Sequence, residues 1–204
     1  MAELKKYYKS PEFIEAGLDE AGRGPLIGRV YAAAVIIDPG AELHPLLNDS
    51  KKMTRKRRGI VREWIEENCV FEVAYSDEKE VDELNILHAT QKAMHKAIDN
   101  LVLEPEYLIV DGNFFRKYIS KSGDHVNHVT IEKGDAKYAS ISAASVLAKE
   151  YHDDYIEELV EENPELDEKY GLLSNMGYGT QKHMEGIEEH GVSKFHRKSF
   201  KCCC

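Results

Sequence analysis

Cysteine is scarce in this sequence and badly placed for a disulfide framework. Four of the 204 residues are cysteines: Cys69 stands alone in a predicted helix, and Cys202, Cys203 and Cys204 are consecutive. Neighbouring cysteines cannot easily be bridged to one another, and no second cluster of metal ligands lies near them in the sequence. These features exclude a small fold held together by disulfides.

Long hydrophobic runs, repeats and low-complexity linkers are also absent. The longest apolar run, Val30–Ile37, is far too short to cross a bilayer, and Met1–Ser10 carry no apolar segment of the kind found in secretory signals. A chain of 204 residues, 42% of them hydrophobic, is large enough for one packed core and short for two. We therefore expect one domain over residues 1–204, in a cytoplasmic monomer with no membrane partner.

Positive charge is in deficit, since 27 lysines and arginines face 37 acidic residues and the formal net charge is −10. This balance argues against a protein that coats nucleic acid by bulk attraction. The basic residues gather in two blocks, Lys51–Arg62 and Lys194–Lys201. Any site for a polyanion must therefore be local and assisted by bound cations, although Lys51–Arg58 also fits the solvated start of a helix.

Hydrophobic periodicity predicts an α/β protein in which strands and helices alternate. The expected strands cover Ile14–Leu18, Val30–Ile37, Val70–Ser76, Tyr107–Val110 and Val126–Ile131. The expected helices cover Thr54–Asn68, Val81–Leu103, Gly134–Val160 and, after a Thr180 cap, the segment that ends at Gly191.

Two adjacent carboxylates, Asp19 and Glu20, end the first strand and are followed by a glycine-rich turn. Mg²⁺ and Mn²⁺ prefer hard oxygen ligands of this kind. Gly22 and Gly24 lack Cβ atoms, so the backbone around Arg23 can lie against a ligand. A hairpin turn that merely carries surface charge is the alternative.

Two further acids follow in the chain. Asp111 stands at the end of a predicted central strand, where α/β sheets place their ligands, although Asp-Gly-Asn is also good turn chemistry. Asp135 opens a predicted helix whose first turns consist mostly of alanine and serine. Such small residues allow the helix to approach the sheet closely. Residue type alone favours an ordinary helix cap for Asp135.

Several stretches, taken in their order along the chain, resemble type 2 ribonuclease H, also called ribonuclease HII. They are Asp19–Pro25, Asn48–Lys52, Leu84–Leu87, Val110–Asn113, Gly134–Lys137, Ile141–Lys149, Gly177–Thr180 and His196–Phe200. The resemblance implies a single catalytic domain with a ribonuclease H-like mixed central sheet flanked by helices. That core would cover about residues 12–150, and a C-terminal helical region about residues 151–201.

The resemblance also implies the activity. The family consists of metal-dependent endoribonucleases that cleave the RNA strand of RNA–DNA hybrids. They also nick 5′ to ribonucleotides embedded in duplex DNA, leaving 5′-phosphate and 3′-hydroxyl ends. The four catalytic carboxylates map onto Asp19, Glu20, Asp111 and Asp135, which would hold two divalent ions, Mg²⁺ or Mn²⁺, with Asp19 bridging them.

Substrate-binding residues follow from the same resemblance. The turn formed by Gly22, Arg23 and Gly24 would present backbone groups to the ribose 2′-hydroxyl, which distinguishes RNA from DNA. Tyr178 would sense the ribose and pack on the next deoxyribose, although without the motif it fits a half-buried core tyrosine. Lys51 and Arg197 would contact phosphates.

The chain also departs from the family pattern. His152 precedes Asp153 where an arginine is usual, Met176 replaces a common lysine, and Arg29 replaces a common proline. These changes affect local salt bridges and backbone contacts rather than the acids. No sliding-clamp motif ends the chain. Two rival functions remain, another ribonuclease H-like nuclease that acts on DNA and a nucleic-acid binder without catalysis.

Overall fold

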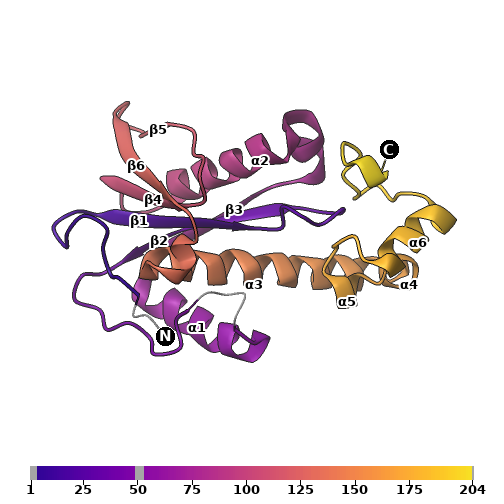
Figure 1. The fold of residues 1–204 in the computed structure, drawn as a ribbon, viewed down its shortest axis with the longest axis horizontal. Helices are drawn as coiled ribbons and strands as arrows, with labels where there is room; N and C mark the ends of the chain where they lie inside the picture. The colour runs from indigo at the N-terminus through magenta and orange to yellow at the C-terminus, as the bar shows by residue number, and fades with distance from the viewer. Residues whose placement is uncertain (1–3, 49–52, 204) are drawn as a thin grey trace.

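A mixed sheet forms the centre of the molecule in the computed structural model, which describes residues 4–48 and 53–203 (Figure 1). Within this part of the chain the strand order is β3-β2-β1-β4-β6-β5. The neighbours β1, β4 and β6 run parallel, while β2, β3 and β5 pair antiparallel to their neighbours. The strands are β1 (Glu15–Ala21), β2 (Val30–Ile37), β3 (Cys69–Ser76), β4 (Tyr107–Asp111), β5 (Tyr118–Ile119) and β6 (His125–Ile131).

Helices cover both faces of this sheet. The described helical elements are α1 (Arg55–Asn68), α2 (Glu78–Asn100), the 3₁₀ turn η2 (Gly134–Ala136), α3 (Ala139–Glu162), α4 (Glu165–Tyr170), α5 (Leu172–Asn175), α6 (Gln181–His190) and the 3₁₀ turn η3 (Lys201–Cys203). One face packs on α2, and the other packs on α1 and α3 (Figure 1). The expected mixed sheet flanked by helices is therefore confirmed.

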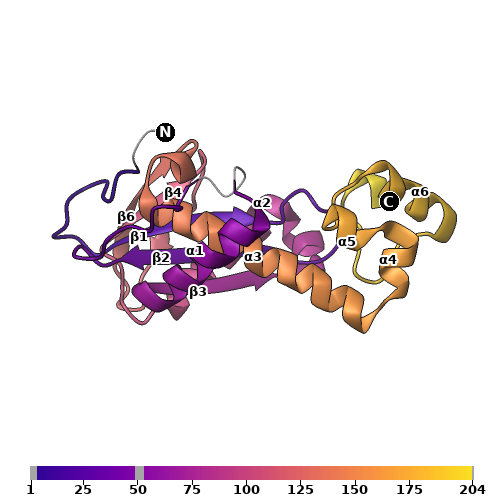
Figure 2. The ribbon, with the colours of Figure 1, turned by 90° about the horizontal axis from the view of Figure 1, so that it is seen from below.

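The long helix α3 links the sheet to the C-terminal region. Its first turns lie against β1, and it then extends past the sheet to the short helices α4, α5 and α6 (Figure 2). Close packing is possible because Gly17 has no side chain. A Cβ there would lie 2.4 Å from the Ser140 carbonyl carbon and 2.5 Å from the Ile141 nitrogen.

Several predicted boundaries differ from the structure. The second long helix begins at Glu78, earlier than expected, because Asp77 and Glu80 form a reciprocal capping box. It is interrupted at Asn85, whose φ is 64°, and it ends at Asn100. The short strand β5 was not expected, and the helix predicted from Gly134 is divided into η2 and α3. No helix in the described ranges is long and apolar enough to span a membrane.

Candidate active site

Two acidic residues lie side by side because their strands are parallel and in register. β1 and β4 pair through Leu18 and Val110, so Asp19 and Asp111, the next residue on each strand, stand at the same level. Neighbouring strands are about 4.8 Å apart, and alternation turns both acids to the face opposite Leu18 and Val110. The predicted position of Asp111, at the carboxyl end of a central strand, is confirmed.

Asp19 is almost completely buried, with 4% of its surface exposed. This burial, together with the carboxylates of Glu20 and Asp111, raises the pKa of Asp19 well above its usual range. A hydrogen bond with the Ser145 side chain of α3 acts in the opposite direction. A bound cation would reduce the repulsion between carboxylates that are buried close together, and a divalent metal ion can supply this charge.

Asp111 also brings the last acidic stretch to this corner. Its Oδ1 accepts a 2.6 Å hydrogen bond from the N–H of Gly134, the first residue of η2. The next residue, Asp135, is 4% exposed. The helix-cap alternative for Asp135 is wrong, because the residues in the cap positions of η2 and α3 are Lys133 and Tyr138. Three stretches that are distant in sequence therefore meet at the carboxyl ends of β1 and β4.

A cleft of about 450 Å³ is lined by Glu20, and also by Ser145, which bonds to Asp19. Its lining residues come from β1, the glycine-rich turn, α1, α3 and the C-terminal region: Glu20, Ala21, Gly22, Arg23, Gly24, Arg58, Ser145, Lys149 and Tyr178. Arg23 donates from Nη1 to Oε1 of Glu20 at 3.1 Å while its side chain stays half exposed. Basic side chains and turn backbone thus stand beside the carboxylates.

Tyr178 reaches the cleft from the C-terminal region and packs on the turn. A Cβ at Gly24 would lie 2.9 Å from Cε1 of its ring. The ring is 44% exposed and lines the cleft, so Tyr178 is not a core tyrosine. Backbone pairing sets this contact, since the N–H of Leu26 donates to the Gly177 carbonyl at 2.8 Å.

The predicted phosphate contact of Arg197 is wrong. Its side chain has no exposed surface, and its guanidinium donates to backbone carbonyls of the segment 22–29 instead of facing the cleft. The other predicted phosphate ligand, Lys51, lies outside the described residues, as do its neighbours 49, 50 and 52.

Comparisons with known proteins identify the family of the chain. A family model described as Ribonuclease HII matches residues 16–203 of the chain. The chain belongs to the ribonuclease HII family. The Ribonuclease HII of Phocaeicola vulgatus is 48% identical over 194 residues, which cover 95% of this chain and 92% of that protein. The chain is therefore a ribonuclease H, a hydrolase that cleaves RNA paired with DNA.

Solved structures agree with this assignment. The chain is similar to the ribonuclease H2 of Pyrococcus horikoshii OT3, with 27% identity, a TM-score of 0.74 and coverage of 93% of this chain and 94% of that one. It is also similar to the ribonuclease HII in a PCNA complex from Archaeoglobus fulgidus, with 26% identity, a TM-score of 0.71 and coverage of 92% and 95%.

The four acids have the ligand chemistry that a divalent cation prefers, but they do not form a preformed coordination site. They supply hard carboxylate oxygens, and burial together with the charges of Glu20 and Asp111 raises the pKa of Asp19. Among the described residues, however, no three His, Cys, Asp or Glu side chains are arranged to hold a metal ion. Asp111 accepts from the Gly134 N–H and Glu20 accepts from Arg23, each through one oxygen, so carboxylate lone pairs remain available to a cation.

His152, which departs from the usual ribonuclease HII pattern, lies beneath the glycine-rich turn. A Cβ at Gly22 would lie 2.5 Å from its Cδ2, so the turn rests on the imidazole. Burial lowers the pKa of His152 and keeps the ring neutral at neutral pH. Its Nδ1 lies 3.2 Å from Oδ1 of the neighbouring Asp153, which also accepts from Arg58 at 3.2 Å and from Lys149 at 2.6 Å.

The other two departures also have structural consequences. Arg29 places its guanidinium carbon 4.0 Å from the ring centre of Tyr75 and 4.4 Å from that of Tyr155, a cation–π arrangement that proline cannot make. Met176 has a φ of 49°, a left-handed conformation that directs the chain into Gly177.

Sequence reasoning missed the roles of Arg58, Ser145 and Lys149 in lining the cleft. Ser145 and Lys149 are four residues apart on α3 and therefore share a helix face, which is a signal that was available. Arg58 had no such signal. It is buried against Glu150 and Asp153 of α3, and only the packing of α1 on α3 brings it to the cleft.

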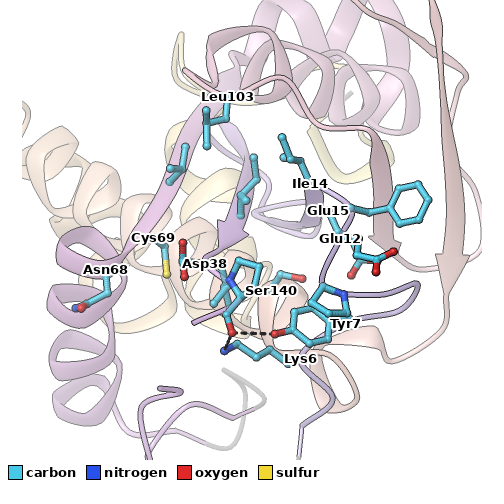
Figure 3. A pocket seen from close by; sticks show the side chains of 16 residues that line it. Lys6, Tyr7, Glu12, Ile14, Glu15, Asp38, Asn68, Cys69, Leu103 and Ser140 are labelled. Atoms are coloured by element: carbon cyan, nitrogen blue, oxygen red, sulfur yellow. Dashed lines mark hydrogen bonds between the residues drawn. The ribbon is translucent and has the colours of Figure 1, made fainter. Parts of the chain in front are cut away.

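A second hollow lies at the other end of β1 and holds none of the acids discussed above (Figure 3). Its volume is about 410 Å³, and its lining includes Lys6, Glu15 and Cys69. Lys6 donates to the carbonyls of Pro39 and Ala41, and burial raises the pKa of Cys69 to about 12, so the thiol is protonated. Glu15 of this hollow and Glu20 of the cleft are five residues apart on one strand, so these two residues are about 16 Å apart.

Proposed function

We propose that Asp19, Glu20, Asp111 and Asp135 bind two divalent cations, Mg²⁺ or Mn²⁺, and that this site carries the ribonuclease H activity. The observation that carries the proposal is the register of β1 and β4, which puts Asp19 and Asp111 at one level beside η2. When bound, two cations supply positive charge at the attacking and leaving oxygens of the phosphodiester.

The chain's own groups prepare this site. Ser145 orients the buried Asp19 carboxylate, and the N–H of Gly134 holds that of Asp111. If Glu20 served as a cation ligand, its ion pair with Arg23 would open, and the Arg23 guanidinium would be available to a substrate phosphate. Cation binding and phosphate binding would thereby be coupled.

Ribose recognition is assigned to the far wall of the cleft. The backbone of Gly22, Arg23 and Gly24 meets the 2′-hydroxyl, and Tyr178 packs on the sugar that follows. Lys51 is proposed as a further phosphate contact. The enzyme would then nick 5′ to a ribonucleotide embedded in duplex DNA and leave 5′-phosphate and 3′-hydroxyl ends.

A duplex with one ribonucleotide tests this proposal directly. The protein is incubated with labelled duplex and Mg²⁺ or Mn²⁺, with EDTA as the metal-free arm and an all-DNA duplex of the same sequence as control. We expect a metal-dependent nick 5′ to the ribonucleotide and no cutting of DNA. Equal cutting of both duplexes would support the rival DNA nuclease, and metal-independent or absent cutting would refute the proposal.

The remaining sequence expectations stay predictions. They are the monomeric state, the cytoplasmic location and the lack of a clamp-binding motif. Size-exclusion chromatography with light scattering measures the first. Titration of the protein with a sliding clamp tests the third, and complex formation would contradict it.

A further inference from the structure

The buried Arg197 devotes its whole guanidinium to one loop. An arginine has five N–H donors, and all five meet backbone carbonyls. Nε donates to Gly28 at 2.8 Å, Nη1 to Arg23 at 3.2 Å and Pro25 at 2.7 Å, and Nη2 to Gly22 at 2.7 Å and Arg29 at 2.9 Å. Each carbonyl belongs to the segment 22–29, which contains the glycine-rich turn.

These bonds decide which way the peptide groups of the turn point. In a trans peptide the C=O and the following N–H point in opposite directions. Because the Gly22 and Arg23 carbonyls point to Arg197, the N–H groups of Arg23 and Gly24 point away from it. Within the described residues neither N–H donates a hydrogen bond. Two free donors are thus directed away from the guanidinium, in a turn that lines the cleft.

The charge of Arg197 adds to this effect. No carboxylate accepts a hydrogen bond from it among the described residues, so five carbonyl dipoles take the place of a counter-ion. Burial lowers the pKa of Arg197 to about 10, so it remains protonated at neutral pH. A positive charge beneath the turn, in a region of low dielectric, favours electron-rich oxygens above it.

We infer that Arg197 is a positioning residue for ribose recognition, which holds residues 22–24 so that the N–H groups of Arg23 and Gly24 donate to the 2′-oxygen of the ribonucleotide. The inference rests on the proposed function and adds to it the group that fixes the turn. Lysine keeps the charge, but a single ammonium with three donors cannot span five carbonyls. Arg197→Lys therefore keeps the positive charge but removes the guanidinium hydrogen bonds, so it distinguishes the effect of these bonds from that of the charge.

The experiment measures discrimination rather than activity alone. In an Asp19→Asn background, which is expected to bind without cutting, Kd is measured for the one-ribonucleotide duplex and for the all-DNA duplex, with and without Arg197→Lys. Arg116→Lys is the matched control, since Arg116 is exposed and does not line the cleft. Cleavage by the wild-type protein is measured on the same duplexes.

Loss of aligned hydrogen bonds should lower the ribose preference by about tenfold in Arg197→Lys and leave it unchanged in Arg116→Lys. General destabilisation of the protein would raise both Kd values by the same factor and leave their ratio unchanged. A wild-type protein that cuts, with an unchanged ratio in Arg197→Lys, would overturn the inference. A wild-type protein that does not cut the ribonucleotide duplex would overturn the proposed function instead.

If the Arg197→Lys protein does not fold, amide NMR of the Asp19→Asn protein tests the inference instead. The Arg23 and Gly24 amide resonances should shift on addition of the ribonucleotide duplex and not with the all-DNA duplex. Identical shifts with both duplexes would contradict the inference.

Discussion

Gly17→Ala tests how the closeness of β1 and α3 supports the site. The added Cβ would lie 2.4 Å from a backbone carbon of Ser140, about 1 Å inside ordinary contact, and backbone cannot rotate away. The helix must shift by a similar amount. Overpacking of this kind costs about 1–3 kcal/mol, or roughly 2–4 °C in Tm for each kcal/mol in a chain of this size.

The same shift should reduce activity beyond the loss of stability. Ser145, which bonds to Asp19, lies on the displaced helix only five residues after Ser140. A displacement of about 1 Å in a catalytic group can cost about a hundredfold in rate. The assay is kcat on the one-ribonucleotide duplex, at a temperature where circular dichroism shows the variant folded.

Gly59→Ala is the matched control. Gly59 lies inside α1, and a Cβ there meets nothing within 4 Å. Alanine should raise stability by about 1 kcal/mol through helix propensity and leave kcat unchanged. A Gly17→Ala protein with wild-type Tm and wild-type kcat would refute the reasoning, because it would show that α3 yields at no cost.

Three other outcomes are expected. Asp19→Asn should abolish cleavage yet raise Tm in metal-free buffer, since it removes a buried carboxyl whose pKa is raised by burial and like charges; cleavage near the wild-type rate would contradict the assignment. Tyr178→Ala should raise KM by about tenfold while Tyr178→Phe keeps it, because the ring supplies the packing surface. Burial and His183 lower the pKa of His196 to about 4, against about 6.5 unfolded, so the unfolded state binds more protons between these values. The free energy of unfolding should therefore fall by up to about 3 kcal/mol from pH 7 to pH 4, and His196→Gln should flatten this slope in denaturant titrations; equal slopes would contradict the prediction.

Much of the fold was predictable because local rules agreed with tertiary packing. The apolar run Val30–Ile37 is the strand β2 with the predicted bounds, since it is buried on both faces. The predicted cap Thr180 and the breaker Gly191 mark real helix ends. The prediction failed at Asn85, where the chain adopts a left-handed conformation inside α2 that no periodicity signals.

The candidate site was predictable in part. Asp19, Glu20 and Asp111 lie at the carboxyl ends of β1 and β4, and the parallel pairing of these strands brings their ends together. Asp135 was proposed only through the family resemblance, because its residue type favoured a helix cap. Its position beside Asp111 depends on the hydrogen bond from the Gly134 N–H to Asp111, which joins segments distant in the sequence.

By itself the sequence determined most of the elements, three of the four acids and the glycine-rich turn between the first two strands, because each depends on residues near one another in the chain. Tertiary structure decided what Arg197 does. A basic residue near the end of a chain suggests a surface contact with phosphate. Burial against Gly28, 169 positions away, instead gives its five donors to backbone. Which carbonyls surround a guanidinium depends on which segments pack together, and no local pattern encodes that.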